Sequence, residues 1–415
     1  GFNPVLTAGE YTLNRACYLR FSVKGSLSDI KISVPADLLS SVLYGSKEDM
    51  AFAPDAKKLN DNISSFEGAV NYIFISDLHN GSYVNDPDGD GLRNYDSAET
   101  VAERLESRVK TVESAVKYAN LCPAIDFIVI GGDIINGYET EESLTYQAAK
   151  KKNKGLTVKE HVKDQLQDML APLKDCKKPV FVLTGNHDFN DAHTLWLSTN
   201  HPENSKKRAD LTLSDLDWNQ AVMKEFVSDG IVRDADYAYS KYYYYDLKKN
   251  DKVTRIICLD IHDSRQPFDS KGNLTGDPTI NSGYRYSDEQ MKWLAEVALK
   301  GNFDSCMVFA HSDMTDGTAK MDKILAAYQQ RTKYHVGGAI SIDADYTMRD
   351  SGSIMLYHHG HEHEYSRDFS PAMNFWTLGS LNMTMEIVIA TKDSVYNYNH
   401  STSEIKEFTR GGESR

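Results

Sequence analysis

The sequence NYIFISDLHN, residues 71–80, decides the fold. A short apolar run over 72–75 stops at Ser76, and Asp77 and His79 follow at once. Successive apolar residues fit a strand that is buried on both faces. A carboxylate and an imidazole two positions apart, directly after such a strand, can reach the same side of the chain. The segment therefore predicts a buried strand with polar side chains gathered at its carboxyl end.

The same pattern recurs along the chain. Apolar runs lie at 127–130, 180–183, 256–259, 307–310 and 354–357, and they end in Asp133, Asn186, Asp260, His311 and the histidine-rich segment 358–363, respectively. Helical periodicity at 100–121 and 158–173 separates some of these runs. Strands alternating with helices predict an α/β (α+β) fold whose sheets are covered by helices. In such folds ligands bind beyond the carboxyl ends of the strands.

The amino-terminal part differs in character. Strand-like stretches at 11–13, 18–23 and 30–34 predict a small β-rich accessory domain over 1–68, closed by a polar linker at about 55–65. The remaining residues, 69–415, form a second and larger predicted domain.

Composition narrows the possible functions. Of 415 residues, 40% are hydrophobic and 26% are charged, which is typical of a globular protein, and no apolar run approaches the ~18 residues of a membrane-spanning helix. The net charge of −14 disfavours nucleic acid or anionic lipid as a main partner, although metal ions can still bring phosphates to an acidic protein. Five cysteines without a CxxC pair argue against a disulfide framework and a thiolate zinc site.

The polar residues at the strand ends form a coherent set of carboxylate, imidazole and carboxamide groups. They are Asp77, His79, Asp133, Asn186, His187, His311, His361 and His363. Such groups suit borderline divalent metals such as manganese, iron, zinc or nickel. Asp133 follows a Gly-Gly pair and could bridge two ions, an arrangement that clamps a phosphoryl group.

Taken in order, these motifs resemble the calcineurin-like metallophosphoesterase family over roughly residues 70–395. The matching blocks are Asp77-Leu78-His79, Gly132-Asp133-Ile134-Ile135-Asn136, Gly185-Asn186-His187-Asp188, His311 and Gly360-His361-Glu362-His363. The resemblance implies a four-layer fold, a sandwich of two β-sheets flanked by helices. It also implies two ions, the first held by Asp77, His79 and His363, the second by Asn186, His311 and His361, with Asp133 between them.

The resemblance further implies hydrolysis of a small phosphate ester by attack of a metal-bound hydroxide. His187 would act as a general acid or stabilise the phosphoryl charge, and Asn136 would orient it. Asn136-Gly137 stand where the serine/threonine phosphatase branch has an acidic residue and Arg-Gly, and Asp188 replaces its usual Glu. These departures argue against a protein phosphatase and move the resemblance toward the bacterial-type phosphodiesterase and phosphomonoesterase branch. Within that branch we expect a phosphodiesterase. Two alternatives stay open: a phosphomonoesterase or nucleotidase, and an extracellular binding module with a degenerate catalytic domain.

Several polar residues outside the predicted ligand set lie near it in the sequence pattern. Asp260-Ile261-His262 repeats the first motif but has no following Gly-Asp block, and is predicted to line the pocket. His358 and His359 are predicted to be structural or to support the ligands. The long polar loops 190–209 and 263–284 are candidates for shaping the substrate site, and Arg265 and Arg285 could contact a phosphate or lie in solvent.

An acidic segment directly follows the first motif. Asp86, Asp88, Asp90, Asn94 and Asp96 resemble the ligands of thrombospondin-type calcium repeats, and a plain acidic turn is the alternative. Calcium would indicate an exported protein, and the compartment otherwise stays open. The sequence does not specify the substrate, the metal or the oligomeric state.

Overall fold

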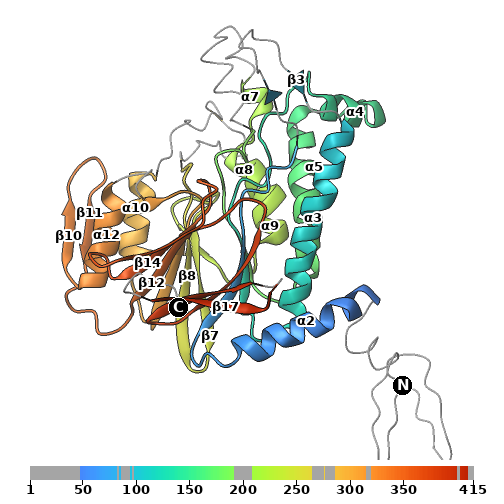
Figure 1. The fold of residues 1–415 in the computed structure, drawn as a ribbon. Coiled ribbons are helices and arrows are strands. Elements are labelled where there is room, and N and C mark those ends of the chain that lie inside the picture. Colours follow the sequence, from blue (N-terminus) through green and yellow to red (C-terminus); the bar gives the residue numbers. More distant parts are fainter. Residues whose placement is uncertain are drawn as a thin grey trace, which may run out of the picture.

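The computed structural model describes residues 47–81, 84–85, 94–95, 98–190, 208–263, 275, 286–314, 319–399 and 402–409. Figure 1 shows two sheets at the centre, with helices α3, α4 and α5 on one side and α10 and α12 on the other. The layers thus match the predicted sandwich of two sheets flanked by helices.

The first sheet is mixed. Its strand order is β17 (Glu404–Thr409), β16 (Ser394–Asn399), β15 (Met385–Ala390), β1 (Val70–Ile75), β4 (Phe127–Ile130) and β5 (Val180–Val182). Strands β1, β4 and β5 run parallel, whereas β15 is antiparallel to β1. The three parallel strands therefore end at one edge.

The second sheet has the order β13 (Ser366–Ser370), β14 (Phe375–Gly379), β12 (Ile354–His359), β9 (Ser305–Phe309), β8 (Lys252–Cys258), β7 (Tyr243–Lys249) and β6 (Val232–Arg233). Strands β8, β9, β12 and β14 are parallel. All six apolar runs predicted as strands are strands of these two sheets.

Alternating side chains bury both faces of the second sheet. Ile256 and Cys258 of β8 pack in one core with residues of the first sheet, and the intervening Ile257 packs in another core with helices α10 and α12. The Tyr72 and Phe309 rings meet between the sheets at 5.3 Å. Because successive strand residues point to opposite faces, an uninterrupted apolar run fits a strand covered on both sides.

Helices of the first layer are α3 (Ala98–Leu121), α4 (Leu144–Lys152) and α5 (Val158–Leu170), the last continued by a 3-10 turn over Ala171–Asp175. Both predicted helices are therefore confirmed. Thr157 and Glu160 begin α5 with a reciprocal capping box. Short helices α7 (Arg208–Leu211), α8 (Asp215–Trp218) and α9 (Lys224–Phe226) follow, with a π-helical turn over Asn219–Met223.

The other layer consists of α10 (Asp288–Trp293), a π-helical turn over Leu294–Ala298 and α12 (Ala319–Gln330). Two small hairpins complete the described fold: β2 (Val84–Asn85) with β3 (Asn94–Tyr95), and β10 (Lys333–Val336) with β11 (Ile342–Asp345). Among the described helices, none is both long and apolar enough to cross a membrane.

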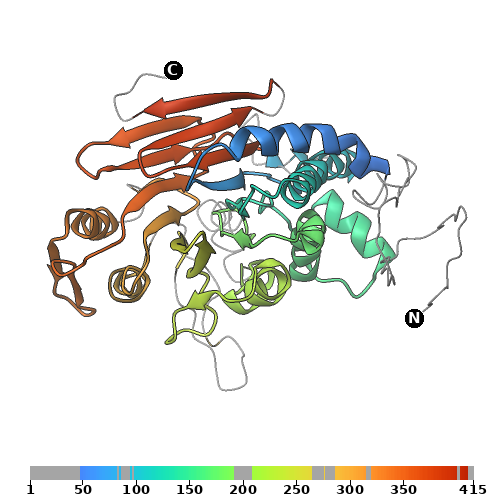
Figure 2. The same ribbon diagram turned by 90° about the horizontal axis from the view of Figure 1, so that it is seen from below.

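The polar linker predicted at about 55–65 is wrong. Helix α2 (Lys47–Ile63) occupies most of it, and Ala56, Leu59 and Ile63 are almost fully buried in the core of the first sheet. Figure 2 shows α2, in blue, beside α3 and the red carboxyl-terminal strands. The proposed strands of the accessory domain, at 11–34, lie outside the described residues.

Other predictions also fall outside the described part. The proposed calcium ligands Asp86, Asp88, Asp90 and Asp96 are not described, and of Asn94 only the backbone pairing in β3 is. Most of the two long polar loops, with Arg265 and Arg285, is likewise outside it.

Candidate metal centre

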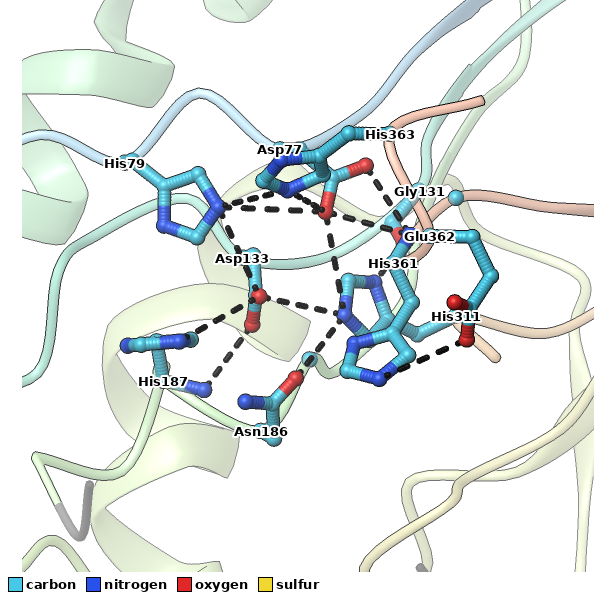
Figure 3. A network of polar contacts seen from close by, with 12 residues as sticks. Asp77, His79, Gly131, Asp133, Asn186, His187, His311, His361, Glu362 and His363 are labelled. Carbon is cyan, nitrogen blue, oxygen red and sulfur yellow. Dashed lines mark hydrogen bonds and ion pairs between the residues drawn. The ribbon is translucent and has the colours of Figure 1, made fainter. Parts of the chain in front are cut away.

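Five parallel strands from both sheets bring the predicted ligands to one place. Asp77 and His79 follow β1, Asp133 follows β4, and Asn186 and His187 follow β5. From the second sheet, His311 follows β9, and His361 and His363 follow β12. Figure 3 shows these side chains converging around Asp133. Residues almost 290 positions apart thus meet because the strands end at a common edge.

The first group consists of Asp77, His79 and His363. The Nε2 atoms of the two histidines are 3.1 Å apart, and Asp77 Oδ1 lies 3.3 Å from His363 Nε2 and 3.9 Å from His79 Nε2. Ligand atoms that each lie ~2.1 Å from one ion are separated by roughly 3–4 Å. The spacing of this group therefore fits a single metal ion.

The second group consists of Asp133, His311 and His361, with Asn186 beside it. His311 Nε2 lies 3.2 Å from Asp133 Oδ2 and 3.1 Å from Asn186 Oδ1. Asp133 Oδ2 is also 3.8 Å from His79 Nε2 in the first group. Asp133 therefore lies between the two groups, and together they offer two ion positions that share one carboxylate.

Burial and neighbouring charges shift the pKa values of the candidate ligands. Burial lowers the pKa of His79 to about 4 and also lowers the pKa of His361, so both imidazoles are neutral near pH 7. Burial alone would raise the pKa of Asp133, but the His311 and His187 imidazoles hold it well below its usual range. Asp133 in turn raises the pKa of His311 to about 10 against the effect of burial. A bound cation must displace that proton, which couples metal binding to proton release.

The backbone of the centre is held in an uncommon conformation. Asp77, His79, Asp133, His361 and His363 have φ angles of 57°, 48°, 51°, 65° and 55°. Side chains other than glycine rarely adopt this left-handed region, and such residues cluster at functional sites. The fold itself therefore fixes the backbone conformation of five predicted ligands, without the help of a bound ion.

Two motif glycines permit this close packing. At Gly132, with φ +94°, a Cβ atom would lie 2.7 Å from the Gly185 nitrogen and 2.8 Å from His311 Nδ1. At Gly185 a Cβ atom would lie 2.8 Å from Asp133 Cγ. The Gly-Gly-Asp and Gly-Asn-His turns can approach one another only because both positions lack a side chain.

Asp188 has a role that the sequence reasoning missed. Its buried carboxylate accepts hydrogen bonds from the backbone nitrogens of Asp133 (3.0 Å), Ile134 (2.7 Å), Ile135 (3.3 Å) and Gly185 (2.7 Å). It therefore ties the turn after β4 to the turn after β5. The signal was present in the Gly-Asn-His-Asp block, where Asp188 had been considered only as a departure from a related branch.

His187 and Asn136 are neighbours, but not through the atoms that were expected. The Nδ1 atom of His187 lies within hydrogen-bond distance of the backbone carbonyl of Asn136, whereas the Asn136 amide donates to Gly81 O at 2.9 Å. His187 Nε2 points toward Asp133 Oδ2 at 3.9 Å. The carbonyl, rather than the amide, is thus placed to orient the ring.

The flanking residues have structural contacts. His358 is fully buried between the Tyr72 hydroxyl (2.9 Å) and the Ser380 hydroxyl (2.7 Å). Asp260 accepts a hydrogen bond from Thr184 at 2.6 Å and pairs with the buried Lys241 at 3.0 Å. The second Asp-x-His motif therefore supports the turn after β5. Arg108 of α3 also binds the centre's backbone, by donating to the His79 carbonyl, and no local sequence signal indicates this contact.

Comparison with known structures gives distant likenesses. A dimetal phosphatase from Danio rerio is 12% identical with a TM-score of 0.47, covering 82% of this chain and 99% of that one. An NAD nucleotidase from Haemophilus influenzae is 11% identical with a TM-score of 0.37, covering 84% of this chain and 53% of that one. A 5'-nucleotidase precursor from Thermus thermophilus is also 11% identical, with a TM-score of 0.36, covering 82% of this chain and 54% of that one. The chain spans about half the length of these two nucleotidases.

A search of curated proteins finds no match. The profile of the calcineurin-like phosphoesterases, in contrast, matches residues 70–365, which is more than half of the chain and includes every predicted ligand. The two ligand groups at the strand ends supply the metal site that this chemistry needs. The chain belongs to the calcineurin-like phosphoesterase family and is a metal-dependent phosphoric ester hydrolase.

Proposed function

We propose that the chain hydrolyses a phosphodiester at a dinuclear centre. Asp77, His79 and His363 would hold one divalent ion, Asn186, His311 and His361 would hold the other, and Asp133 would serve both. The main support is the position of the Asp133 Oδ2 atom, 3.2 Å from His311 Nε2 and 3.8 Å from His79 Nε2. A single carboxylate between two groups of imidazoles fits a pair of ions better than two separate sites.

The donor set suits manganese, iron, zinc or nickel. When bound, two such ions supply positive charge for the phosphoryl oxygens and make a water molecule more acidic. The chain's own residues hold the rest of the geometry. Asp188 fixes the Asp133 turn by accepting hydrogen bonds from three of its backbone N–H groups, and the Asp77 carboxylate accepts the His361 N–H at 3.1 Å.

His187 is the proposed proton donor to the leaving oxygen. Its Nδ1–H donates to the Asn136 carbonyl, which directs Nε2 into the centre. The Asp133 Oδ1 atom also accepts the His187 backbone N–H at 2.8 Å. Both contacts limit rotation of the ring, so a proton on Nε2 is presented toward the bound phosphoryl group.

The preference for a diester rests on charge. A phosphomonoester dianion carries more negative charge than a diester and gains more from a guanidinium group. Gly137 occupies the position where the serine/threonine branch has arginine. The neighbouring Asn136 amide donates its hydrogen bond to the Gly81 carbonyl. The segment after Asp133 therefore adds no positive charge, which favours the singly charged ester.

The test compares bis-p-nitrophenyl phosphate with p-nitrophenyl phosphate, using metal-stripped protein reloaded with manganese, iron, zinc or nickel. We expect faster metal-dependent turnover of the diester. Faster turnover of the monoester would instead assign a phosphatase or nucleotidase. Inactivity toward both compounds with every metal would leave the diester proposal without support.

Asp133→Asn tests the bridge. We expect at least ~100-fold lower turnover, because one substitution weakens both ions. Asp304→Asn is the matched control, since Asp304 is a carboxylate outside the centre that accepts the Val253 N–H at 2.7 Å. Wild-type turnover in reloaded Asp133→Asn protein would contradict the bridging role.

A further inference from the structure

A cavity lies far from the metal centre and has no role in the proposed hydrolysis. Its volume is about 770 Å³, within the range of small-molecule sites. Its wall includes residues at or near the beginning of four strands, namely Val70 of β1, Thr254 of β8, Ser305 of β9 and Met355 of β12. The candidate ligands follow the other ends of β1, β9 and β12. At ~3.3 Å per residue, the six residues of β1 separate the two sites by roughly 20 Å.

The cavity gathers positive charge on an acidic chain. Five cationic side chains line it, against only two carboxylates, whereas the whole chain has a net charge of −14. The cationic residues are Lys249, Lys252, Arg331, Arg349 and Lys392, and the acidic ones are Glu67 and Asp304. Such a local reversal of sign attracts anions to one place on the molecule.

Two of these cations are fixed by the fold. Lys249 pairs with Asp126 at 2.8 Å and donates to the Ala69 carbonyl at 2.9 Å. Arg349 donates to the Tyr328 carbonyl at 2.6 Å and stacks on the Tyr328 ring at 3.9 Å. These contacts fix the end of β7 and the segment before β12 in the cavity wall.

The other three cations are exposed. Lys252, Arg331 and Lys392 come from three separate segments, namely the start of β8, the end of α12 and the turn between β15 and β16. One Arg331 nitrogen reaches the Asp350 carbonyl only at 3.4 Å, which leaves the guanidinium group available for a stronger acceptor.

The two carboxylates offset only part of this charge, because five cationic side chains outnumber them. Asp304 is turned to its own sheet, where it accepts the Val253 N–H at 2.7 Å. Uncharged polar groups complete the wall: Gln329 is held between the Ile354 N–H (2.8 Å) and the Asn374 carbonyl (2.8 Å), and the Thr254 and Ser305 hydroxyls are 3.0 Å apart. The lining therefore places uncharged polar side chains, held by hydrogen bonds of their own, inside a cationic rim.

We propose that this cavity binds a small polyanion that carries phosphate or carboxylate groups. Three exposed cations on separate segments suit a ligand with several negative groups, and a 770 Å³ space suits a small molecule. This site is distinct from the metal centre, because the strands hold the two sites apart.

The test is calorimetric titration of inorganic tripolyphosphate and of citrate into the full chain, with Asp133→Asn protein used to remove binding at the metal centre. We expect binding that persists in Asp133→Asn and weakens with ionic strength. Adding Lys252→Glu and Arg331→Glu should lower the affinity at least about tenfold, since two cations at the rim become anions.

Lys151→Glu with Lys154→Glu is the matched control, because it changes the net charge equally at exposed positions on and just after α4. We expect less than about threefold loss there. Equal losses in the two double variants would overturn the proposal in favour of a general charge effect. Absence of binding of both probes would overturn it as well, and binding of hexaglutamate alone would assign the surface to an acidic peptide instead.

Discussion

Replacing Gly185 by alanine should disable the centre while leaving the fold intact. Gly185 lies in the turn after β5, with its α-carbon against the Asp133 carboxylate and backbone nitrogen. Its φ angle is not among the positive ones, so an alanine meets no backbone strain at this position. The effect of the substitution is therefore purely steric.

The size of the effect follows from the contact distances. An added Cβ atom would lie 2.1 Å from Asp133 Oδ1, 2.2 Å from the Asp133 backbone nitrogen and 2.8 Å from Asp133 Cγ, whereas non-bonded carbon atoms pack at about 3.5 Å. The Asp133 carboxylate and its backbone must therefore move by more than about 1 Å. Displacements near 1 Å can reduce a rate by ~100-fold, and overpacking of this kind costs about 1–3 kcal/mol of stability.

The measurements are the affinity for Mn²⁺ by calorimetry, kcat with bis-p-nitrophenyl phosphate, and the free energy of unfolding in urea. We expect at least about tenfold weaker metal binding and ~100-fold lower kcat in a folded protein. Gly155→Ala is the control, because its nearest neighbour is Asn153 Oδ1 at 3.7 Å. Wild-type affinity and kcat in Gly185→Ala would refute the claim that this contact positions Asp133.

Three further outcomes are expected. Asp188→Asn should weaken Mn²⁺ binding but change the free energy of unfolding of the metal-free protein little. Burial and the Asp133 charge raise the pKa of Asp188 to about 7, so an uncharged amide avoids their cost and offsets the lost backbone hydrogen bonds. A loss of stability above ~3 kcal/mol in the metal-free protein would contradict this balance. Burial and Asp260 also raise the pKa of Asp263 to about 7, so the folded protein keeps a proton that the unfolded chain releases near pH 4. Between these values wild-type stability should fall with rising pH by up to ~1.4 kcal/mol per unit relative to Asp263→Asn, and parallel urea curves at pH 5, 6 and 7 would count against it. His187→Ala should lower kcat ~100-fold at unchanged metal stoichiometry, and loss of one ion would instead make His187 a ligand.

Much of the site could be predicted from the sequence because each ligand directly follows an apolar run. A strand buried on both faces has few polar residues of its own, so the polar cluster that follows its apolar run marks its carboxyl end. Which atom makes a contact could not be predicted in this way. The Asn136 carbonyl and amide stand at the same position in the chain, and only the fold directs the carbonyl to His187 and the amide to Gly81.

The error at α2 has a different origin. Ala56, Leu59 and Ile63 have helical spacing, but the intervening residues are polar, and this composition favoured a linker. Helix formation there depends on the core that these three side chains enter. The antiparallel strands at the carboxyl terminus were likewise not predicted, because no local pattern indicates that β15 pairs with β1.

The pairing of β1 with β15 also has a consequence for synthesis of the chain. Ile75 and Met385 are neighbours across the sheet but 310 positions apart. At about 5–20 residues per second, a ribosome needs roughly 15–60 s to pass from one to the other. Throughout that time β1 lacks its partner on one side, and an open apolar strand edge is a template for aggregation. A nascent chain that stops before β15 therefore already contains every predicted metal ligand, yet leaves the strand that precedes Asp77 and His79 unprotected.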